Sequence, residues 1–149
     1  MTAADLARVS CSAFFLAGLI TGWWKYRCIA ASPTATAPVY VDICHRAALM
    51  YAFACLVLAE LASLSAWPAA VNLWAVGGPI LFFALALASY AVHALLADTD
   101  NQLAQPHRLG RHAVHPAMVK GFMVLLATVE IGGSAVLAAG YLRTLTVTA

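Results

Sequence analysis

Four long apolar stretches run through this chain of 149 residues and leave little sequence for anything else. They cover residues 5–24, 41–63, 71–97 and 116–142, and a helix needs about 20 apolar residues to cross the hydrocarbon core of a bilayer. The composition agrees, because 64% of the residues are hydrophobic and only 9% are charged. The sequence therefore predicts an all-α integral membrane protein, with residues 1–149 forming a single transmembrane domain built as a four-helix bundle.

Basic residues gather on one side of the predicted membrane. Four crossings put the connections 25–40 and 98–115 on one side, and both termini with the turn at 64–70 on the other. The first side carries Lys25, Arg27, Arg46, Arg108, Arg111 and Lys120, and the second carries Arg8 and Arg143. The positive-inside rule then predicts that both termini lie outside the cytoplasm, in a bacterial-type inner membrane or a plasma membrane. We expect the first helix to be retained rather than cleaved, because residues 23–27 form an interfacial aromatic and basic cluster.

The charge pattern and the absent motifs exclude several function classes. A net charge of +2 without a basic block indicates a protein whose main partner is the lipid bilayer and not nucleic acid. The sequence contains no nucleophile elbow, phosphate-binding glycine loop, dinucleotide fingerprint or His-Glu-x-x-His motif, which argues against hydrolases and nucleotide-driven pumps. The four cysteines include no Cys-x-x-Cys pair, so buried apolar cysteines are a better interpretation than a thiolate zinc site.

Two histidines occupy corresponding positions in neighbouring helices. His45 lies about one turn inside the start of the second helix, and His93 about one turn before the end of the third, so antiparallel helices place them at similar depth. Imidazole is a good ligand for haem iron or another transition metal, so the two histidines are candidate metal ligands. The alternative interpretation is a pair of interfacial histidines that bond to carbonyls or water. Ala48, Ala52 and Cys55 follow His45 on one stripe, where a flat macrocycle or a closely packed helix would fit.

Two further side chains are candidates for chemistry. Tyr90 lies one turn before His93, where a phenol can donate a hydrogen bond to a substrate oxygen or act as a general acid. The alternative for Tyr90 is a residue of the interfacial aromatic belt. Glu130 lies about fourteen residues into the fourth helix and hence near the middle of the membrane. An ionisable side chain at that depth is a candidate proton relay or ion ligand. Its alternative is a protonated carboxyl that is bonded to a neighbouring helix.

The connection at 98–115 is the longest polar segment of the chain. It contains Asp98, Asp100, His107, His112 and His115. The spacing matches no zinc pattern and the segment has no cysteine, so we expect a solvated interfacial loop, with a loop metal site as the alternative.

With His45 and Tyr90 in these places, the chain resembles the small membrane isomerases typified by styrene oxide isomerase and hydroxylaminobenzene mutase. The resemblance rests on four membrane helices over nearly the whole chain, on His45 near the start of the second helix, and on Tyr90 in the third at a comparable separation. It implies a trimer that holds haem b through the histidine between subunits, with ferric iron as Lewis acid and the tyrosine holding the epoxide oxygen. The chain departs from the family at Tyr51 and Ala52, where the family has asparagine and glycine, and at Phe82, where it has aspartate.

Three functions remain open on this basis. The first is a haem-binding, homo-oligomeric isomerase that rearranges a small lipophilic epoxide or hydroxylamine, with His45 as axial ligand and Tyr90 as catalytic residue. If His93 is a second axial ligand, a bis-histidine electron-transfer protein is the better interpretation, because the iron then has no open position. The third is a cofactor-free membrane protein, either a small transporter that uses Glu130 or an assembly factor.

Overall fold

The computed structural model describes residues 1–147 and contains four long helices and one short hairpin. The elements are α1 (Ala3–Ala31), α2 (Val39–Leu64), α3 (Ala69–Leu96), β1 (Arg108–Leu109), β2 (His112–Ala113) and α4 (Pro116–Val147). All four helices are long and apolar enough to cross a membrane. The predicted all-α, multi-pass four-helix fold is therefore confirmed.

The helices match the expected ranges except at two ends. α1 continues to Ala31 instead of ending at residue 24, and α4 continues to Val147 instead of residue 142. In α1 the interfacial residues contain no helix breaker, and the helix ends only where Ser32, the residue before Pro33, adopts an extended conformation. The start of α1 is set by a capping box between Thr2 and the third helical residue.

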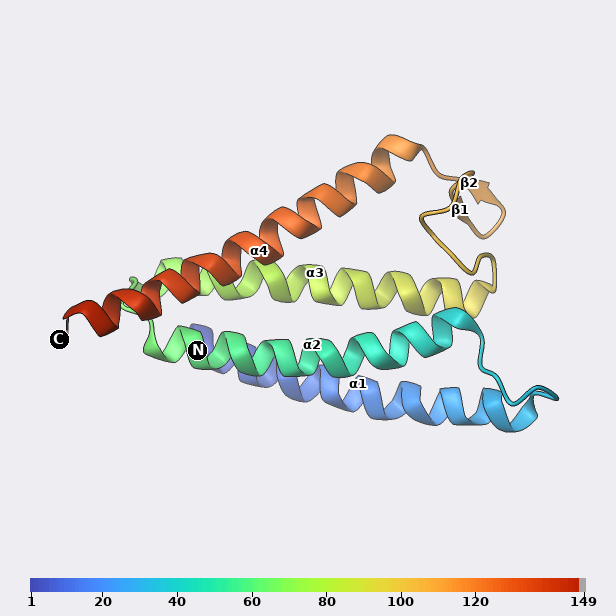
Figure 1. The fold of residues 1–149 in the computed structure, drawn as a ribbon, viewed down its shortest axis with the longest axis horizontal. Helices are drawn as coiled ribbons and strands as arrows, with labels where there is room; N and C mark the ends of the chain where they lie inside the picture. The colour runs from blue at the N-terminus through green and yellow to red at the C-terminus, as the bar shows by residue number, and fades with distance from the viewer. Residues whose placement is uncertain (148–149) are drawn as a thin grey trace.

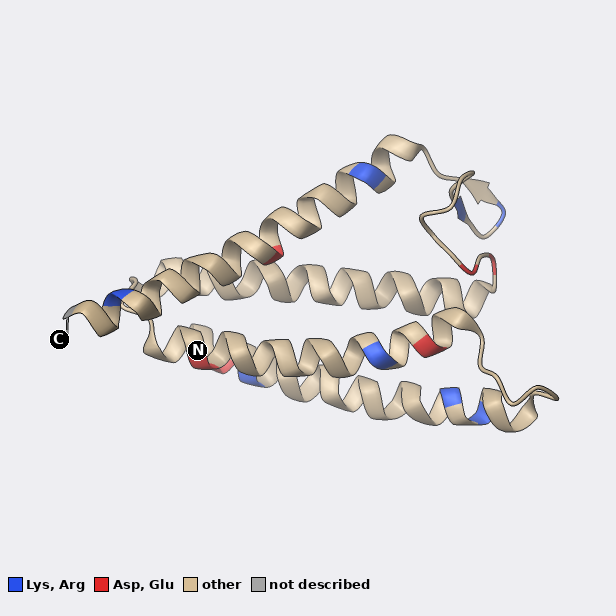
Figure 2. Cartoon of the chain, viewed as in Figure 1, with Lys and Arg blue, Asp and Glu red and all other residues tan. Residues whose placement is uncertain are grey.

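The helices α1, α2 and α3 lie side by side, and α4 approaches them at one end only (Figure 1). The C-terminal half of α4 packs near the turn between α2 and α3, whereas its N-terminal half diverges from α3 toward the hairpin. Figure 2 shows charged residues mainly near the two ends of the bundle. At the hairpin end, Asp42 and Arg46 of α2 form an ion pair at 3.0 Å, and Lys25 of α1 joins it.

The core lies where α1, α2 and α3 meet the C-terminal half of α4. It consists of Ala7, Phe14, Ala52, Cys55, Leu58, Ala59, Ala75, Val76, Phe83 and Leu137. Many large apolar side chains on the outer helix faces are exposed, which suits a protein whose surroundings are lipid. Since lipid is as apolar as the core, close packing of small residues, and not hydrophobicity alone, holds the helices together.

The backbone of α4 approaches α3 closely at Gly133. A Cβ atom added there would lie 2.6 Å from the carbonyl oxygen of Ala75 and 2.8 Å from Cγ of Pro79. Pro79 has no N–H group, so the Ala75 carbonyl lacks its helical donor and is covered by the Gly133 backbone instead. At Gly121, by contrast, an added Cβ would meet nothing within 4 Å in the part of the chain that the structure describes. The backbones thus meet closely at Gly133, whereas toward the hairpin they diverge and the rings of Phe82 and Phe122 bridge them at 5.9 Å (Figure 1).

Replacing Gly133 by alanine is expected to destabilise the bundle by about 1–3 kcal/mol, because the extra methyl group enters a filled contact. Gly132→Ala is the matched control, since an added Cβ at Gly132 meets no atom of a neighbouring helix within 4 Å among residues 1–147. The control should be neutral or slightly stabilising, because alanine is the better helix former. Thermal unfolding in detergent, followed by circular dichroism, measures both. Equal midpoints for the two variants would contradict the contact.

Candidate functional site

A cavity of about 230 Å³ lies between the C-terminal half of α3, the loop at 97–115 and the N-terminal half of α4. We call it the loop cavity. Its α4 wall is apolar and consists of Met118, Val119, Phe122 and Met123. Its other side, which we call the polar wall, carries Ser89, His93, Gln102 and His107 beside the apolar loop residues Leu103, Leu109 and Val114. An apolar cavity with a few polar groups on one side is the usual form of a site for a small lipophilic molecule.

The main feature of the polar wall is a buried histidine–aspartate pair. His93 Nδ1 lies 2.7 Å from Asp98 Oδ1, and the two side chains are only 6% and 5% exposed. The other carboxylate oxygen accepts the backbone N–H of Gly110. Burial by itself raises the pKa of Asp98, but the hydrogen bonds from His93 and Gly110 outweigh burial and hold that pKa below its usual value. Because an ionised carboxylate can only accept, Nδ1 of His93 carries the proton and Nε2 is the basic nitrogen.

The backbone around the end of α3 brings this pair together. Ala97 adopts a left-handed conformation with φ 48° and donates its N–H to the His93 carbonyl oxygen, which turns the chain back over the last helical turn. Asp98 follows directly and so reaches His93. Gly110 begins the two-residue turn between β1 and β2 with φ +61°, a conformation that favours glycine. The hairpin thus places its turn N–H against the carboxylate.

Gln102 ties the loop to two helices. Its backbone N–H donates to the hydroxyl of Tyr40 in α2, and its side-chain oxygen accepts the Ser89 hydroxyl of α3 at 3.0 Å. Its carbonyl oxygen lies 3.1 Å from His107 Nδ1. The expectation of a solvated loop is wrong for His107, which is 8% exposed, because hydrogen bonds fold this part of the loop onto the helices.

The alternative of a loop metal site finds no support. His112 and His115 are exposed. Within residues 1–147, no group of three or more histidine, cysteine or acidic side chains is placed to hold a metal ion.

A row of tyrosines leads from His93 toward the middle of the membrane. The Tyr40 ring lies 5.0 Å from the His93 ring and 6.2 Å from the ring of Tyr90, between ring centroids. Tyr90 is half-buried, and further into the bundle the ring of Tyr51 in α2 stacks on Phe83 of α3 at 4.5 Å. Glu130 of α4 has its Oε1 buried without a hydrogen-bond partner in the described chain. Sequence reasoning overlooked Tyr40 and Tyr51 as site residues, because membrane proteins commonly place tyrosine near interfaces.

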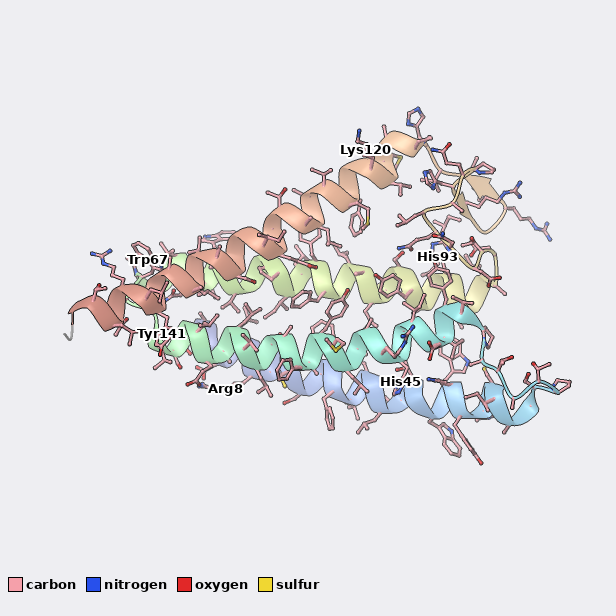
Figure 3. All side chains as sticks on the ribbon, viewed as in Figure 1. Arg8, His45, Trp67, His93, Lys120 and Tyr141 are labelled. Atoms are coloured by element: carbon pink, nitrogen blue, oxygen red, sulfur yellow. The ribbon has the colours of Figure 1, made fainter. Side chains whose placement is uncertain are left out.

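His45 lies in a different interface from His93. Its Nδ1 is 2.9 Å from the carbonyl oxygen of Gly18 in α1, and its ring packs against Gly22, where an added Cβ would come 2.8 Å from Cε1. This is the carbonyl-bonded arrangement that the sequence left open as an alternative. Figure 3 shows both histidines in the half of the bundle that carries the loop. Among the hydrogen bonds and ring contacts of residues 1–147, none joins the two imidazoles.

The small residues that follow His45 are buried inside the bundle. Ala48, Ala52 and Cys55 are 0%, 4% and 0% exposed, and the last two belong to the central core. The stripe is covered by neighbouring helices and presents no open face to a macrocycle. His45 itself fits a haem ligand better than the stripe does. The Gly18 carbonyl oxygen engages Nδ1 of His45, so Nε2 would be left to bind iron.

A second hollow, of about 680 Å³, lies at the opposite end of the bundle, where α1 and α3 begin. Its charged groups, Asp5 and Arg8, pair with each other at 3.3 Å. The loop cavity, with an imidazole nitrogen left for a ligand, is therefore the stronger candidate site.

Asp98→Asn is expected to lower stability in a pH-dependent way. Since the folded carboxyl has a depressed pKa, its contribution is complete above the ordinary value of 3.8 and is lost as the pH falls through the folded value. The free energy of unfolding of wild type should exceed that of the variant by about 1–2 kcal/mol from neutral pH down to about pH 4. Below that pH the two free energies should converge. Thermal midpoints in detergent across this range measure the difference, with the exposed Asp100→Asn as control. A difference that does not change with pH would contradict an ionised Asp98.

No family model, curated protein or solved structure matches this chain. The resemblance to the small membrane isomerases accordingly stays a hypothesis that rests on the residues of the sequence. The functional conclusions below rest on the geometry of the loop cavity and of His45.

Proposed function

We propose that this protein binds a small lipophilic molecule in the loop cavity and moves a proton at the polar end of that molecule through His93. The observation that carries the proposal is the His93–Asp98 pair, which lies on the polar wall of a cavity whose opposite wall is apolar. An apolar cavity of roughly 150 Å³ can hold benzene, so about 230 Å³ suits a single ring or short chain with one polar group.

The polar wall supports proton transfer as the chemistry. Asp98 accepts Nδ1–H of His93, which leaves Nε2 to take a proton from one atom of the ligand and return it to another atom of the same molecule. Such an isomerisation needs no oxidant and no second substrate. Ser89 donates to the side-chain oxygen of Gln102, so the Gln102 amide N–H groups remain for an oxygen or nitrogen of the ligand on which charge develops.

The bilayer supplies both the ligand and the route to the cavity. A lipophilic molecule partitions into the membrane, and the loop cavity lies between α3 and the N-terminal half of α4, which diverges from α3 (Figure 1). We also propose that the loop end faces the cytoplasm. Most of the Lys and Arg residues lie at that end, which is the distribution that the positive-inside rule describes (Figure 2).

His93→Gln is expected to reduce turnover by roughly 100-fold or more, since general base catalysis contributes that much. The matched control is His112→Gln, because His112 is exposed on the hairpin and should leave the rate unchanged. The assay incubates the protein in nanodiscs with a panel of aryl epoxides and arylhydroxylamines and separates the products by chromatography. Equal rates for wild type and His93→Gln would exclude the imidazole as the base.

A second candidate function is a haem protein with His45 as ligand. It is favoured by the Gly18 carbonyl, which engages Nδ1 and leaves Nε2 to hold iron. Bound haem iron would supply Lewis-acid chemistry to a substrate oxygen or nitrogen, as the resemblance to homo-oligomeric membrane isomerases implies. Tyr90, on the neighbouring helix, would be the residue that the same resemblance makes catalytic. The bis-histidine version stays a prediction, since His93 contacts Tyr40 and Asp98 whereas His45 lies against Gly18 and Gly22 of α1.

Under this second candidate, protein from haem-replete cells should show a Soret band that His45→Ala abolishes. His115→Ala is the control, because His115 is exposed and outside the α1–α2 interface. Absorption spectra of the detergent-solubilised protein, oxidised and reduced, measure the effect. A Soret band of full strength in His45→Ala would remove His45 as the ligand.

A further inference from the structure

We propose that the hairpin of β1 and β2 binds the phosphate groups of anionic phospholipids at the membrane surface through Arg108 and Arg111. The partner is an anionic lipid surface, and the docking element is the hairpin that projects from the end of the bundle (Figure 1). The inference goes beyond the proposed function and does not depend on it, because it concerns the surface of the protein and its test needs no substrate.

The hairpin carries positive charge that the protein itself does not neutralise. Residues 101–129 include no acidic side chain. Arg108 and Arg111 are exposed, and none of the ion pairs among residues 1–147 includes either of them. The carboxylate that the hairpin does contact is Asp98, whose two oxygens are already engaged within the protein. Both guanidinium groups are therefore left for an anion outside the chain.

The hairpin differs in this respect from the basic residues of α1 and α2 at the same end of the bundle. There, Lys25 and Arg46 both pair with Asp42. Figure 2 shows basic and acidic segments close together on those helices, whereas the hairpin carries basic segments only. An external anion is therefore favoured at the hairpin over the surface formed by α1 and α2.

The position of the hairpin selects a lipid headgroup as that anion. It connects α3, which ends at Leu96, to α4, which begins at Pro116, and both helices are long and apolar enough to cross a membrane. The hairpin therefore emerges where the hydrocarbon core ends and the headgroups begin. Leu109 and Leu103 of the same loop are 45% and 50% exposed. Exposed leucine beside arginine suits this boundary, because the apolar side chain can enter the acyl region while the guanidinium group stays at the phosphates.

The hairpin presents its arginines in a form that suits phosphate. A guanidinium group carries N–H donors in a planar fork that matches two phosphate oxygens. Arg111 shares the two-residue turn with Gly110, and the base of the hairpin is closed by the Val114 N–H, which donates to the His107 carbonyl oxygen at 2.9 Å. Because this element is short and hydrogen-bonded, little backbone freedom is lost when a headgroup binds.

Lipid binding at the hairpin also affects the loop cavity. Arg108 and Leu109 line that cavity, and the Gly110 N–H donates to Asp98. A headgroup that binds the folded hairpin stabilises it against opening. The hydrogen bond between Gly110 and Asp98 should therefore open less often in an anionic membrane than in a neutral one.

The test is hydrogen–deuterium exchange, followed by mass spectrometry, of the protein in nanodiscs of phosphatidylcholine with and without phosphatidylglycerol. Phosphatidylglycerol should slow exchange in residues 107–115 by roughly fivefold or more, since one arginine near an anionic surface strengthens binding by about that factor. The double variant Arg108→Gln/Arg111→Gln should lose this slowing. Arg108→Lys/Arg111→Lys should keep most of it, because the charge is retained.

Arg27→Gln is the matched control, because Arg27 is exposed at the same end of the bundle but outside the hairpin. It should show the same slowing as wild type. Exchange in residues 39–64 of α2 shows whether each variant is folded, and it should be the same in all of them.

Three results would overturn the inference. The first is equal exchange of residues 107–115 in the two lipid compositions. The second is equal slowing in wild type and in the glutamine double variant, which would assign the effect to another surface. The third is the same slowing when inorganic phosphate is added to phosphatidylcholine nanodiscs, which would make the ligand a free anion and not a lipid headgroup.

Discussion

The contact between Gly133 of α4 and the Ala75 carbonyl of α3 fixes where α4 joins the other three helices. Pro79 removes the helical donor of that carbonyl, and only a residue without a side chain allows α4 to approach closely enough to cover it. The contact lies in the C-terminal half of α4, and the other half diverges from α3. This divergence leaves room for the loop cavity, which α4 lines on one side with apolar residues.

The surroundings of the buried carboxyl groups in this protein reflect how costly an unpaired charge is in a medium of low dielectric constant. Asp98, at the end of α3, is buried but accepts two hydrogen bonds, so it remains an anion and orients His93. Glu130, in the middle of α4, has neither a cation nor a donor among residues 1–147 at its buried oxygen. The cost of ionisation therefore differs between the two carboxyl groups, because their surroundings differ.

The parts of the site that sequence could predict are those that stand out from an apolar background. His93 and Glu130 were identifiable because imidazole and carboxyl groups are scarce in membrane helices. The partner of His93 was not. Asp98 reaches His93 only because Ala97, at the end of α3, adopts a left-handed conformation that turns the chain back. The small residues after His45 had two interpretations with identical spacing, and only their burial in the core identifies the helix contact.

The sequence by itself determined the four helical spans and the side of the membrane on which basic residues gather. It also determined which ionisable side chains stand out within the apolar helices. These follow from composition and length, because a bilayer requires about 20 apolar residues with internally satisfied backbone groups. The tertiary structure decided which groups meet: His45 with Gly18, His93 with Asp98, and the tyrosines with one another. Helices that are apolar on all sides carry little information about rotation or crossing. Those are set by packing at particular small residues and by how the connecting loop folds back.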